Sequence, residues 1–305
     1  MRIIFMGTPD FAVASLDALV NAGCDIVAVV TAPDKPAGRG QKLSESAVKK
    51  YAVEHDLPVL QPEKLKNPEF IEELKSYRAD LQVVVAFRML PEVVWNMPLK
   101  GTINLHASLL PEYRGAAPIN WAIINGEKQS GVSTFFLQHE IDTGNIIFSE
   151  VVEIEPNDTA GDLHDKLMQT GAKLLVQTVK AIETGQYPET PQKEVTSTTP
   201  THAPKIFKED CVINWNQPVQ KVYNLIRGLS PYPTAYTSIN GKTLKIFAAD
   251  VVEKEPGIQP SGFLSDGKTY LNFACIDGFI SVKDVQVEGK KRMTVEEFLR
   301  GFRLH

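Results

Sequence analysis

The first hundred residues alternate short apolar runs with helix-like stretches, and this alternation constrains the fold more than any other feature. The expected strands cover residues 2–6, 25–31, 59–60 and 81–86, and the expected helices cover 10–22, 44–55 and 68–77. Strands that are apolar throughout and separated by helices are typical of a parallel sheet covered by helices on both faces. We therefore predict a doubly wound, mostly parallel, Rossmann-like α/β domain over residues 1–188.

A different pattern follows a segment with the composition of a linker. Residues 188–204 contain four prolines and many hydroxyl side chains, and we assign the linker to 189–204. Beyond it, short β-type runs are separated by the turn signals Asn240-Gly241, Asp266-Gly267 and Asp277-Gly278. The expected strands include 212–215, 235–238, 244–247, 270–273 and 279–282, with helices at 217–229 and 294–302. We predict a small OB-like β-barrel domain over 205–305.

Charge is distributed unevenly between these two parts. The formal net charge of −5 argues against a generic polyanion binder, although a net value can hide a basic patch. Residues 205–305 carry 14 Lys and Arg against 11 Asp and Glu, while the rest of the chain carries 18 against 26. The basic character therefore lies late in the chain, with one early exception in a loop at 32–42.

Several classes of protein are excluded by what the sequence lacks. Its three cysteines are scattered without CxxC spacing, which argues against a disulfide framework and a cysteine metal site, and we expect no metal. No apolar run approaches the length of a membrane span, and residues 1–5 show no signal-peptide pattern, so we expect a cytoplasmic protein without a membrane partner. GxGxxG and P-loop motifs are also absent, which disfavours a nicotinamide or nucleotide triphosphate cofactor.

Polar residues with chemical potential gather after residue 102. Asn104 and His106 stand two apart, so on a strand their side chains share one face. An asparagine amide can donate to a developing oxyanion, and an imidazole can take a proton near neutral pH. Asp142, in an Asp-Thr-Gly turn, could orient that imidazole and stabilise its cation. Each residue alone is more often structural, but the pair followed by an exposed polar loop at 108–115 favours a catalytic set.

These motifs carry a resemblance. Asn104-Leu105-His106, Ser108-Leu109-Leu110-Pro111, Tyr113-Arg114-Gly115 and Asp142-Thr143-Gly144 resemble, in order and spacing, the folate-dependent formyltransferase family. The resemblance implies 10-formyltetrahydrofolate as the donor and Asn104, His106 and Asp142 as the catalytic set. It also implies the residues that line the folate: Ser108, Leu109, Leu110, Pro111, Phe87, Arg88, Met89, Leu90 and Ile141. Phe87-Arg88 departs from the Tyr-Gly step that the family usually has there.

The family includes enzymes that act on a purine precursor, on amino sugars and on methionyl-tRNA. The length and the second domain disfavour the first. The Gly/Pro-rich loop at 32–42 resembles the one that tRNA-specific members press against the acceptor stem, which implies Lys35, Arg39 and Lys42 as tRNA contacts. Segments such as Ile226-Arg227-Gly228-Leu229-Ser230-Pro231 resemble the C-terminal domain of those members. The expected partner is initiator methionyl-tRNA, and the expected state is a monomer.

Two alternatives stay open at this point. An amino-sugar formyltransferase could share the same catalytic core and also carry a second domain. A non-catalytic RNA-binding protein could use the same scaffold, although the intact set of Asn104, His106 and Asp142 argues against it.

Overall fold

The computed structural model describes residues 1–37, 42–195 and 199–303, and these divide into two compact units. The first unit contains Met1–Gly115, Gly131–Val152 and His164–His202. The second contains Ala116–Ser130, Glu153–Leu163 and the residues from Ala203 on. The division is discontinuous along the chain, because two short early segments group with the later residues.

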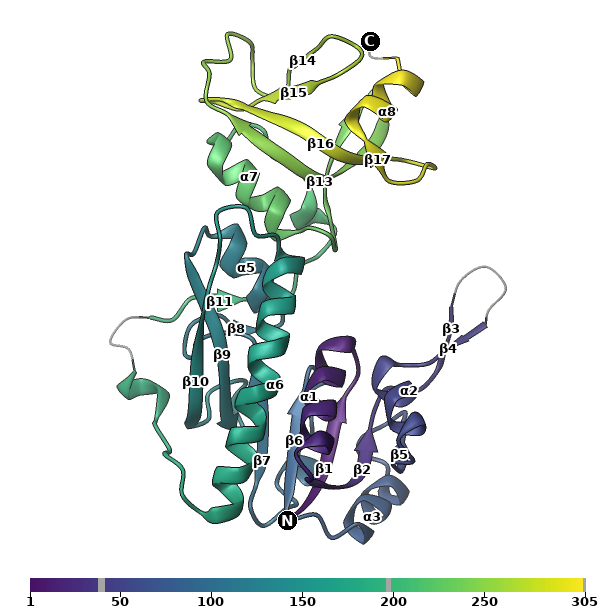
Figure 1. The fold of residues 1–305 in the computed structure, drawn as a ribbon, viewed down its shortest axis with the longest axis vertical. Helices are drawn as coiled ribbons and strands as arrows, with labels where there is room; N and C mark the ends of the chain where they lie inside the picture. Colours follow the sequence, from purple (N-terminus) through teal and green to yellow (C-terminus); the bar gives the residue numbers. More distant parts are fainter. Residues whose placement is uncertain (38–41, 196–198, 304–305) are drawn as a thin grey trace. The chain divides into compact units, whose positions relative to one another are not determined.

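The first unit is built on a seven-stranded sheet with the order β10-β9-β7-β6-β1-β2-β5 (Figure 1). Its strands are β1 (Arg2–Gly7), β2 (Asp25–Val30), β5 (Val59–Leu60), β6 (Leu81–Val85), β7 (Thr102–His106), β9 (Gln129–Phe136) and β10 (Ile146–Glu153). Strand β1 pairs in parallel with β2 and β6, β2 with β5, and β6 with β7, whereas β9 runs antiparallel to β7. The predicted mostly parallel, Rossmann-like sheet is confirmed.

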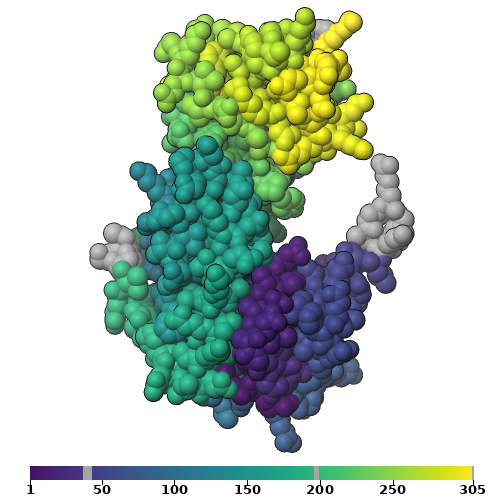
Figure 2. All heavy atoms as spheres, viewed as in Figure 1, coloured from purple at the N-terminus to yellow at the C-terminus, as the bar shows by residue number. Residues whose placement is uncertain are grey.

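Helices cover both faces of this sheet. They are α1 (Asp10–Asn21), α2 (Ala47–Glu54), α3 (Pro68–Ser76), α4 (Glu92–Trp95) and α6 (Ala160–Thr184). Ile4 and Met6 of β1 pack with Phe70 of α3 and Val94 of α4 in one apolar cluster. Helices α1 and α6 lie side by side over the sheet (Figures 1 and 2), where the rings of Phe11 and His164 meet edge to face.

Helix α6 was not predicted, although its start carries a local signal. The Thr159 hydroxyl accepts a hydrogen bond from Asp162 N, and the Asp162 carboxylate accepts one from Thr159 N. This reciprocal arrangement satisfies backbone donors that a helix leaves open at its first turn. Farther along, Gly171 allows α6 to approach β7 closely, because a Cβ there would lie 2.9 Å from a Leu105 methyl carbon.

The second unit is an antiparallel sheet with the order β12-β13-β16-β15-β14, and β17 pairs with β16. Its strands are β12 (Ala235–Ile239), β13 (Lys242–Val252), β14 (Phe263–Ser265), β15 (Leu271–Ala274), β16 (Phe279–Val287) and β17 (Met293–Thr294). The sheet curls into a half-barrel, which agrees with the predicted small barrel-like domain. Trp215 stacks on Phe273 in its core, with ring centroids 4.6 Å apart.

Three helices complete this unit: α5 (Pro118–Ile124), α7 (Val219–Gly228) and α8 (Val295–Gly301). The predicted Asn240-Gly241 turn joins β12 to β13, and both residues have positive φ, at 47° and 74°. The predicted capping box of Thr294 and Glu297 starts α8. The strand predicted at 212–215 is wrong, because the segment follows the 3-10 turn Glu209–Cys211 and Val212 forms only an isolated bridge to Tyr236.

The described ends of the basic loop form a two-stranded ribbon, which we did not predict from the sequence. Strands β3 (Lys35–Ala37) and β4 (Lys42–Ser44) pair antiparallel. Arg39 lies outside the described residues. Near the ribbon, Asp34 forms an ion pair with Lys49 and accepts a 2.8 Å hydrogen bond from Gln61. The hydrogen bond from Lys49 lowers the pKa of the Asp34 carboxyl. No helix in the described parts of the chain is long and apolar enough to cross a membrane.

Candidate active site

The polar pair lies at the carboxyl end of β7, between β6 and β9. Asn104 stands opposite Phe135 of β9 and is half-buried, whereas His106 stands opposite Ser133 and is 6% exposed. Strand alternation directs both side chains to the same face, as predicted. Ligands of doubly wound sheets bind outside the carboxyl ends of the strands, so the pair occupies the expected edge.

One hydrogen bond defines the state of the His106 ring. Its Nε2 lies 2.9 Å from the carbonyl oxygen of Tyr113. A carbonyl only accepts hydrogen bonds, so Nε2 carries a hydrogen and donates it. In the neutral ring, Nδ1 is then the nitrogen with a free lone pair. His106 is thereby held in the tautomer that can accept a proton at Nδ1.

Asp142 occupies the loop between β9 and β10 in a left-handed conformation, with φ of 55°. Its Oδ2 accepts a 3.0 Å hydrogen bond from the backbone N of Gly115. Two residues later, a Cβ on Gly144 would lie 1.6 Å from the Phe136 carbonyl oxygen. Only glycine fits there, so the Asp-Thr-Gly sequence fixes the path of the loop as well as supplying the carboxylate.

Gln192 holds this loop in place, and sequence reasoning did not find it. Its Nε2 donates 2.8 Å hydrogen bonds to the carbonyl oxygens of both Asp142 and Gly144. Its Oε1 accepts from Nε and Nη2 of Arg114, at 3.0 and 2.6 Å. Gln192 is only 3% exposed and starts a 3-10 turn inside the segment that we predicted as a linker. A glutamine in a proline-rich segment gave no local signal of this role.

The structure does not pair His106 with Asp142 directly. Among the described residues, no hydrogen bond joins the two side chains, and the Asn104 amide and the Asp142 Oδ1 also have no partner. Both side chains instead bind the same short backbone segment: His106 donates to the Tyr113 carbonyl, and Asp142 accepts from the Gly115 amide. The Asn104 amide and the Asp142 Oδ1 are therefore available for a ligand at this edge of the sheet.

The loop after His106 is buried rather than exposed, which corrects our expectation. Ser108 and Leu110 are almost inaccessible, and Pro111 is also buried. The reason is Ser133, whose hydroxyl donates to the Ser108 carbonyl at 2.8 Å and accepts from Leu110 N at 3.1 Å. Leu109 packs against Gly131, where a Cβ would lie 2.4 Å from a Leu109 methyl carbon. Residues 108–111 thus form a firm wall beside His106.

A second predicted ligand-lining segment follows β6, which is the parallel neighbour of β7. Phe87 is half-buried, Leu90 is buried and Met89 is 74% exposed. The Arg88 guanidinium donates to the backbone carbonyls of Pro62 and Glu63, at 2.8 Å for Glu63. Burial lowers the pKa of Arg88. Arg88, where the sequence departs from the family pattern, is thus bound to the backbone of Pro62 and Glu63.

The remaining predicted residues lie elsewhere in the first unit. Ile141 is exposed beside Asp142, and Lys35 is exposed on β3. Lys42 belongs to β4, and Arg39 is outside the described part of the chain. No cluster of His, Cys, Asp and Glu among the described residues could hold a metal ion.

The chain matches known protein families and proteins over nearly its whole length. Residues 1–179 match the family model described as formyl transferase, and residues 205–303 match the formyl transferase C-terminal domain. The chain belongs to the formyltransferase family. Within this family, a methionyl-tRNA formyltransferase of Bacteroides fragilis is 54% identical over 100% of this chain and 96% of its own length. One from Flavobacterium johnsoniae is 50% identical over 99% of this chain and 96% of its own.

Two solved structures share the fold. An N-formyltransferase from Helicobacter canadensis, solved with folinic acid and dTDP-3-aminofucose, has a TM-score of 0.67 and 23% identity over 92% of this chain and 98% of its own. HypX from Aquifex aeolicus, solved with tetrahydrofolic acid, has a TM-score of 0.67 and 20% identity, covering 100% of this chain and 48% of its own. At these identities the likeness supports the fold alone.

Proposed function

We propose that this chain transfers the formyl group of 10-formyltetrahydrofolate to the α-amino group of methionyl-initiator tRNA, and so serves translation initiation. The observation that carries the proposal is the 54% identity to a curated methionyl-tRNA formyltransferase over the full length of this chain. The similarity includes the C-terminal domain and the basic loop as well as the catalytic core. We further propose that the enzyme acts as a cytoplasmic monomer.

The proposed chemistry uses the three polar side chains in sequence. The methionyl amine attacks the formyl carbon, and a carbon–nitrogen bond forms while the formyl oxygen becomes an oxyanion. The Asn104 amide, which has no protein partner among the described residues, donates to that oxyanion. His106 Nδ1 takes the proton of the attacking amine. The intermediate then collapses, the bond to N10 of the folate breaks, and the proton passes to N10.

Asp142 acts as an electrostatic partner in this scheme. Its Oδ2 is occupied by Gly115 N, which leaves Oδ1 to stabilise the imidazolium or the developing ammonium. Gln192 keeps the carboxylate in position through the two carbonyl hydrogen bonds described above. A carboxylate that is already oriented has little reorganisation to undergo when charge develops in the reaction.

Two segments at neighbouring strand ends are proposed to bind the folate. Residues 108–111 form the buried wall after β7, and residues 87–90 follow β6, with Ile141 contributing from the loop of Asp142. The proximity of β6 and β7 in the sheet supports this assignment. Arg88 is proposed to shape the pocket indirectly, because its guanidinium is engaged with the carbonyls of Pro62 and Glu63.

Lys35, Arg39 and Lys42 are proposed to contact the tRNA backbone from the basic loop. Lys and Arg side chains that neutralise phosphates supply affinity for a nucleic-acid backbone that does not depend on its sequence. The C-terminal domain, with its excess of Lys and Arg, is proposed to contact the same tRNA.

The deciding experiment offers labelled 10-formyltetrahydrofolate together with charged initiator tRNA and, in separate reactions, with amino-sugar nucleotides. Formylation of the tRNA alone is expected. Formylation of the sugar nucleotides instead would identify an amino-sugar formyltransferase. Tight tRNA binding without any formyl transfer would identify a non-catalytic RNA-binding protein.

A further inference from the structure

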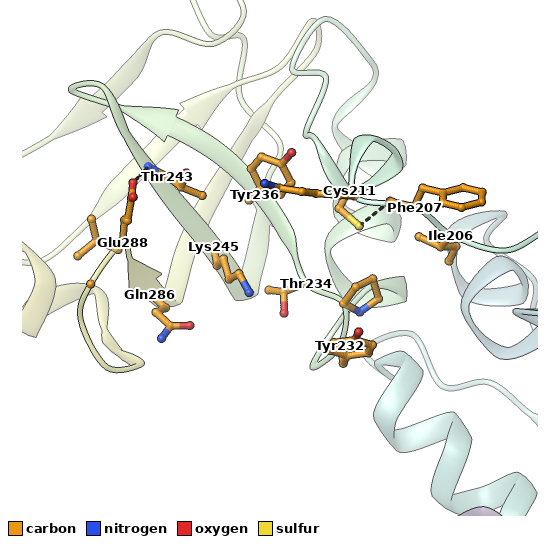
Figure 3. Close-up of a pocket in the computed structure, with 14 residues that line it drawn as sticks. Ile206, Phe207, Cys211, Tyr232, Thr234, Tyr236, Thr243, Lys245, Gln286 and Glu288 are labelled. Atoms are coloured by element: carbon orange, nitrogen blue, oxygen red, sulfur yellow. Dashed lines mark hydrogen bonds between the residues drawn. The ribbon is translucent and has the colours of Figure 1, made fainter. Parts of the chain in front are cut away.

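The second unit contains a pocket that none of the roles above uses. It has a volume of about 620 Å³ and lies where the segment around Phe207, the segment around Tyr232 and strands β12, β13 and β16 meet (Figure 3). This volume falls within the roughly 300–1,000 Å³ of small-molecule sites. All of its lining residues belong to the half-barrel domain, so the pocket exists without any contribution from the catalytic unit.

An uncompensated cation points into this pocket. Lys245 lies on β13 between the buried residues Leu244 and Ile246, and its ammonium projects between Gln286 and Thr234 (Figure 3). It is half-buried, and no carboxylate in the described parts of the chain lies within ion-pair distance of it. A partly desolvated cation without a counterion favours an anionic ligand.

The other charges around the pocket leave the balance positive. Lys208 lines the pocket and is exposed. The single lining carboxylate, Glu288, lies 3.5 Å from the backbone N of Thr243. Two cations therefore face one carboxylate, and that carboxylate can also accept hydrogen bonds from the amino groups of a ligand.

Two aromatic side chains flank these charges and are unusually exposed. Tyr232 is 82% exposed and Phe207 is 58% exposed. The Lys205 ammonium lies 5.4 Å from the centre of the Phe207 ring. Proteins that bind single-stranded nucleic acid combine exposed aromatic rings with nearby cations, because bases stack on the rings while phosphates pair with the cations.

We propose that this pocket binds one unpaired nucleotide of the tRNA substrate, with its base stacked on Tyr232 and its phosphate paired with Lys245. The proposal rests on the proposed function, which supplies the RNA. The nucleotide must be unpaired, because a base inside a duplex has no free face to offer an aromatic ring. The pocket thus adds a recognition point in the half-barrel domain that is separate from the basic loop.

Kinetics of two variants test this site. Tyr232→Ala is expected to raise KM for methionyl-tRNA by about 5- to 100-fold, which is the range of a lost base stack. Lys245→Met is expected to raise the same KM and to reduce the salt dependence of binding by about one phosphate contact. In both variants kcat and KM for the folate donor stay within twofold. Tyr270→Ala and Lys268→Met, on exposed residues of the same domain outside the pocket, serve as controls and leave KM unchanged.

Chemical probing of the tRNA provides a second readout. Acylation of 2′-hydroxyl groups is expected to reveal one unpaired nucleotide that wild-type enzyme and the controls protect and Tyr232→Ala does not. Unchanged tRNA affinity and unchanged protection in both pocket variants would overturn the site. If wild-type enzyme formylates no tRNA but still shows this protection, the proposed function fails while the nucleotide site stands.

Discussion

At the proposed reaction centre, single hydrogen bonds determine which polar atoms of His106 and Asp142 have no protein partner among the described residues. The Tyr113 carbonyl accepts a hydrogen bond from Nε2 of His106, and the backbone N of Gly115 donates one to Oδ2 of Asp142. The other imidazole nitrogen and the other carboxylate oxygen are the atoms that we propose to face the substrate. A short backbone segment between the two residues therefore sets both protonation and orientation, without a direct contact between the side chains.

Asp142→Asn separates the charge of this residue from its structural contact. The amide oxygen can still accept the hydrogen bond from Gly115 N, so the melting temperature is expected to change little. Turnover is expected to fall by about 10²- to 10³-fold, the usual size of the loss when one contact to a developing charge is removed. Single-turnover formylation and a thermal melt measure the two effects, with Glu140→Gln in the same loop as the control. Near-normal turnover in the folded variant would remove Asp142 from the mechanism.

Gln192→Glu tests the clamp on the Asp142 loop. The carboxylate can still accept from Arg114, but it has no N–H for the carbonyls of Asp142 and Gly144. Leaving such buried acceptors unpaired costs about 1–3 kcal/mol, so we expect a lower free energy of unfolding and a reduced kcat with little change in KM for tRNA. Urea unfolding and steady-state kinetics check this, with exposed Gln186→Glu as the matched control. Equal stability and kcat for the two variants would contradict the clamp.

Among the secondary structure elements, the β3–β4 ribbon is the connection to which we assign a binding role. Its two strands pair antiparallel, and Asp34, just before β3, binds Lys49 and Gln61. The ribbon needs no apolar core of its own, which frees its residues for contact with an anionic partner.

Replacing Lys35, Arg39 and Lys42 with serine is expected to lower kcat/KM for methionyl-tRNA by at least about tenfold at moderate salt, because three phosphate contacts are lost. KM for the folate donor should not change. Kinetics at several salt concentrations measure the effect, and the triple variant of Lys75, Lys173 and Lys180 on the surface of the first unit is the control. Equal salt dependence in the two triple variants would show that the ribbon does not bind RNA.

Local sequence patterns predict a helix or strand well where the buried residues and the capping residues of that element are close together in the sequence. The strands β1, β2 and β6 and the start of α8 were predictable because their apolar runs and caps are contiguous. Helix α6 was not predicted, although Thr159 and Asp162 cap its start. The buried loop at 108–111 depends on Ser133, and the Asp142 loop depends on Gln192, fifty residues away in sequence. Contacts between such distant residues leave no periodic signature in the sequence.

For the molecule as a whole, the cysteines report on folding. Burial raises the pKa of Cys24 and Cys211, and it raises the pKa of Cys275 to about 12. Since the thiolate is the reactive form, all three should react slowly with a thiol reagent at pH 8 in the native protein. We expect Cys24, the most accessible of the three, to react first, and all three to react rapidly in urea. Rapid labelling of Cys275 under native conditions would contradict its burial.

The position of Gln192 also determines where the catalytic part of the chain can be cut. The family model for this part ends at residue 179, yet the clamp on Asp142 lies thirteen residues farther on, and Thr190 and Thr201 hydrogen-bond back to Ile146 and Tyr113. A minimal transferase engineered to stop at 179 would keep the three residues that we propose as catalytic and lose the glutamine that holds the Asp142 loop. The part of the chain that supports the Asp142 loop therefore extends at least through Thr201.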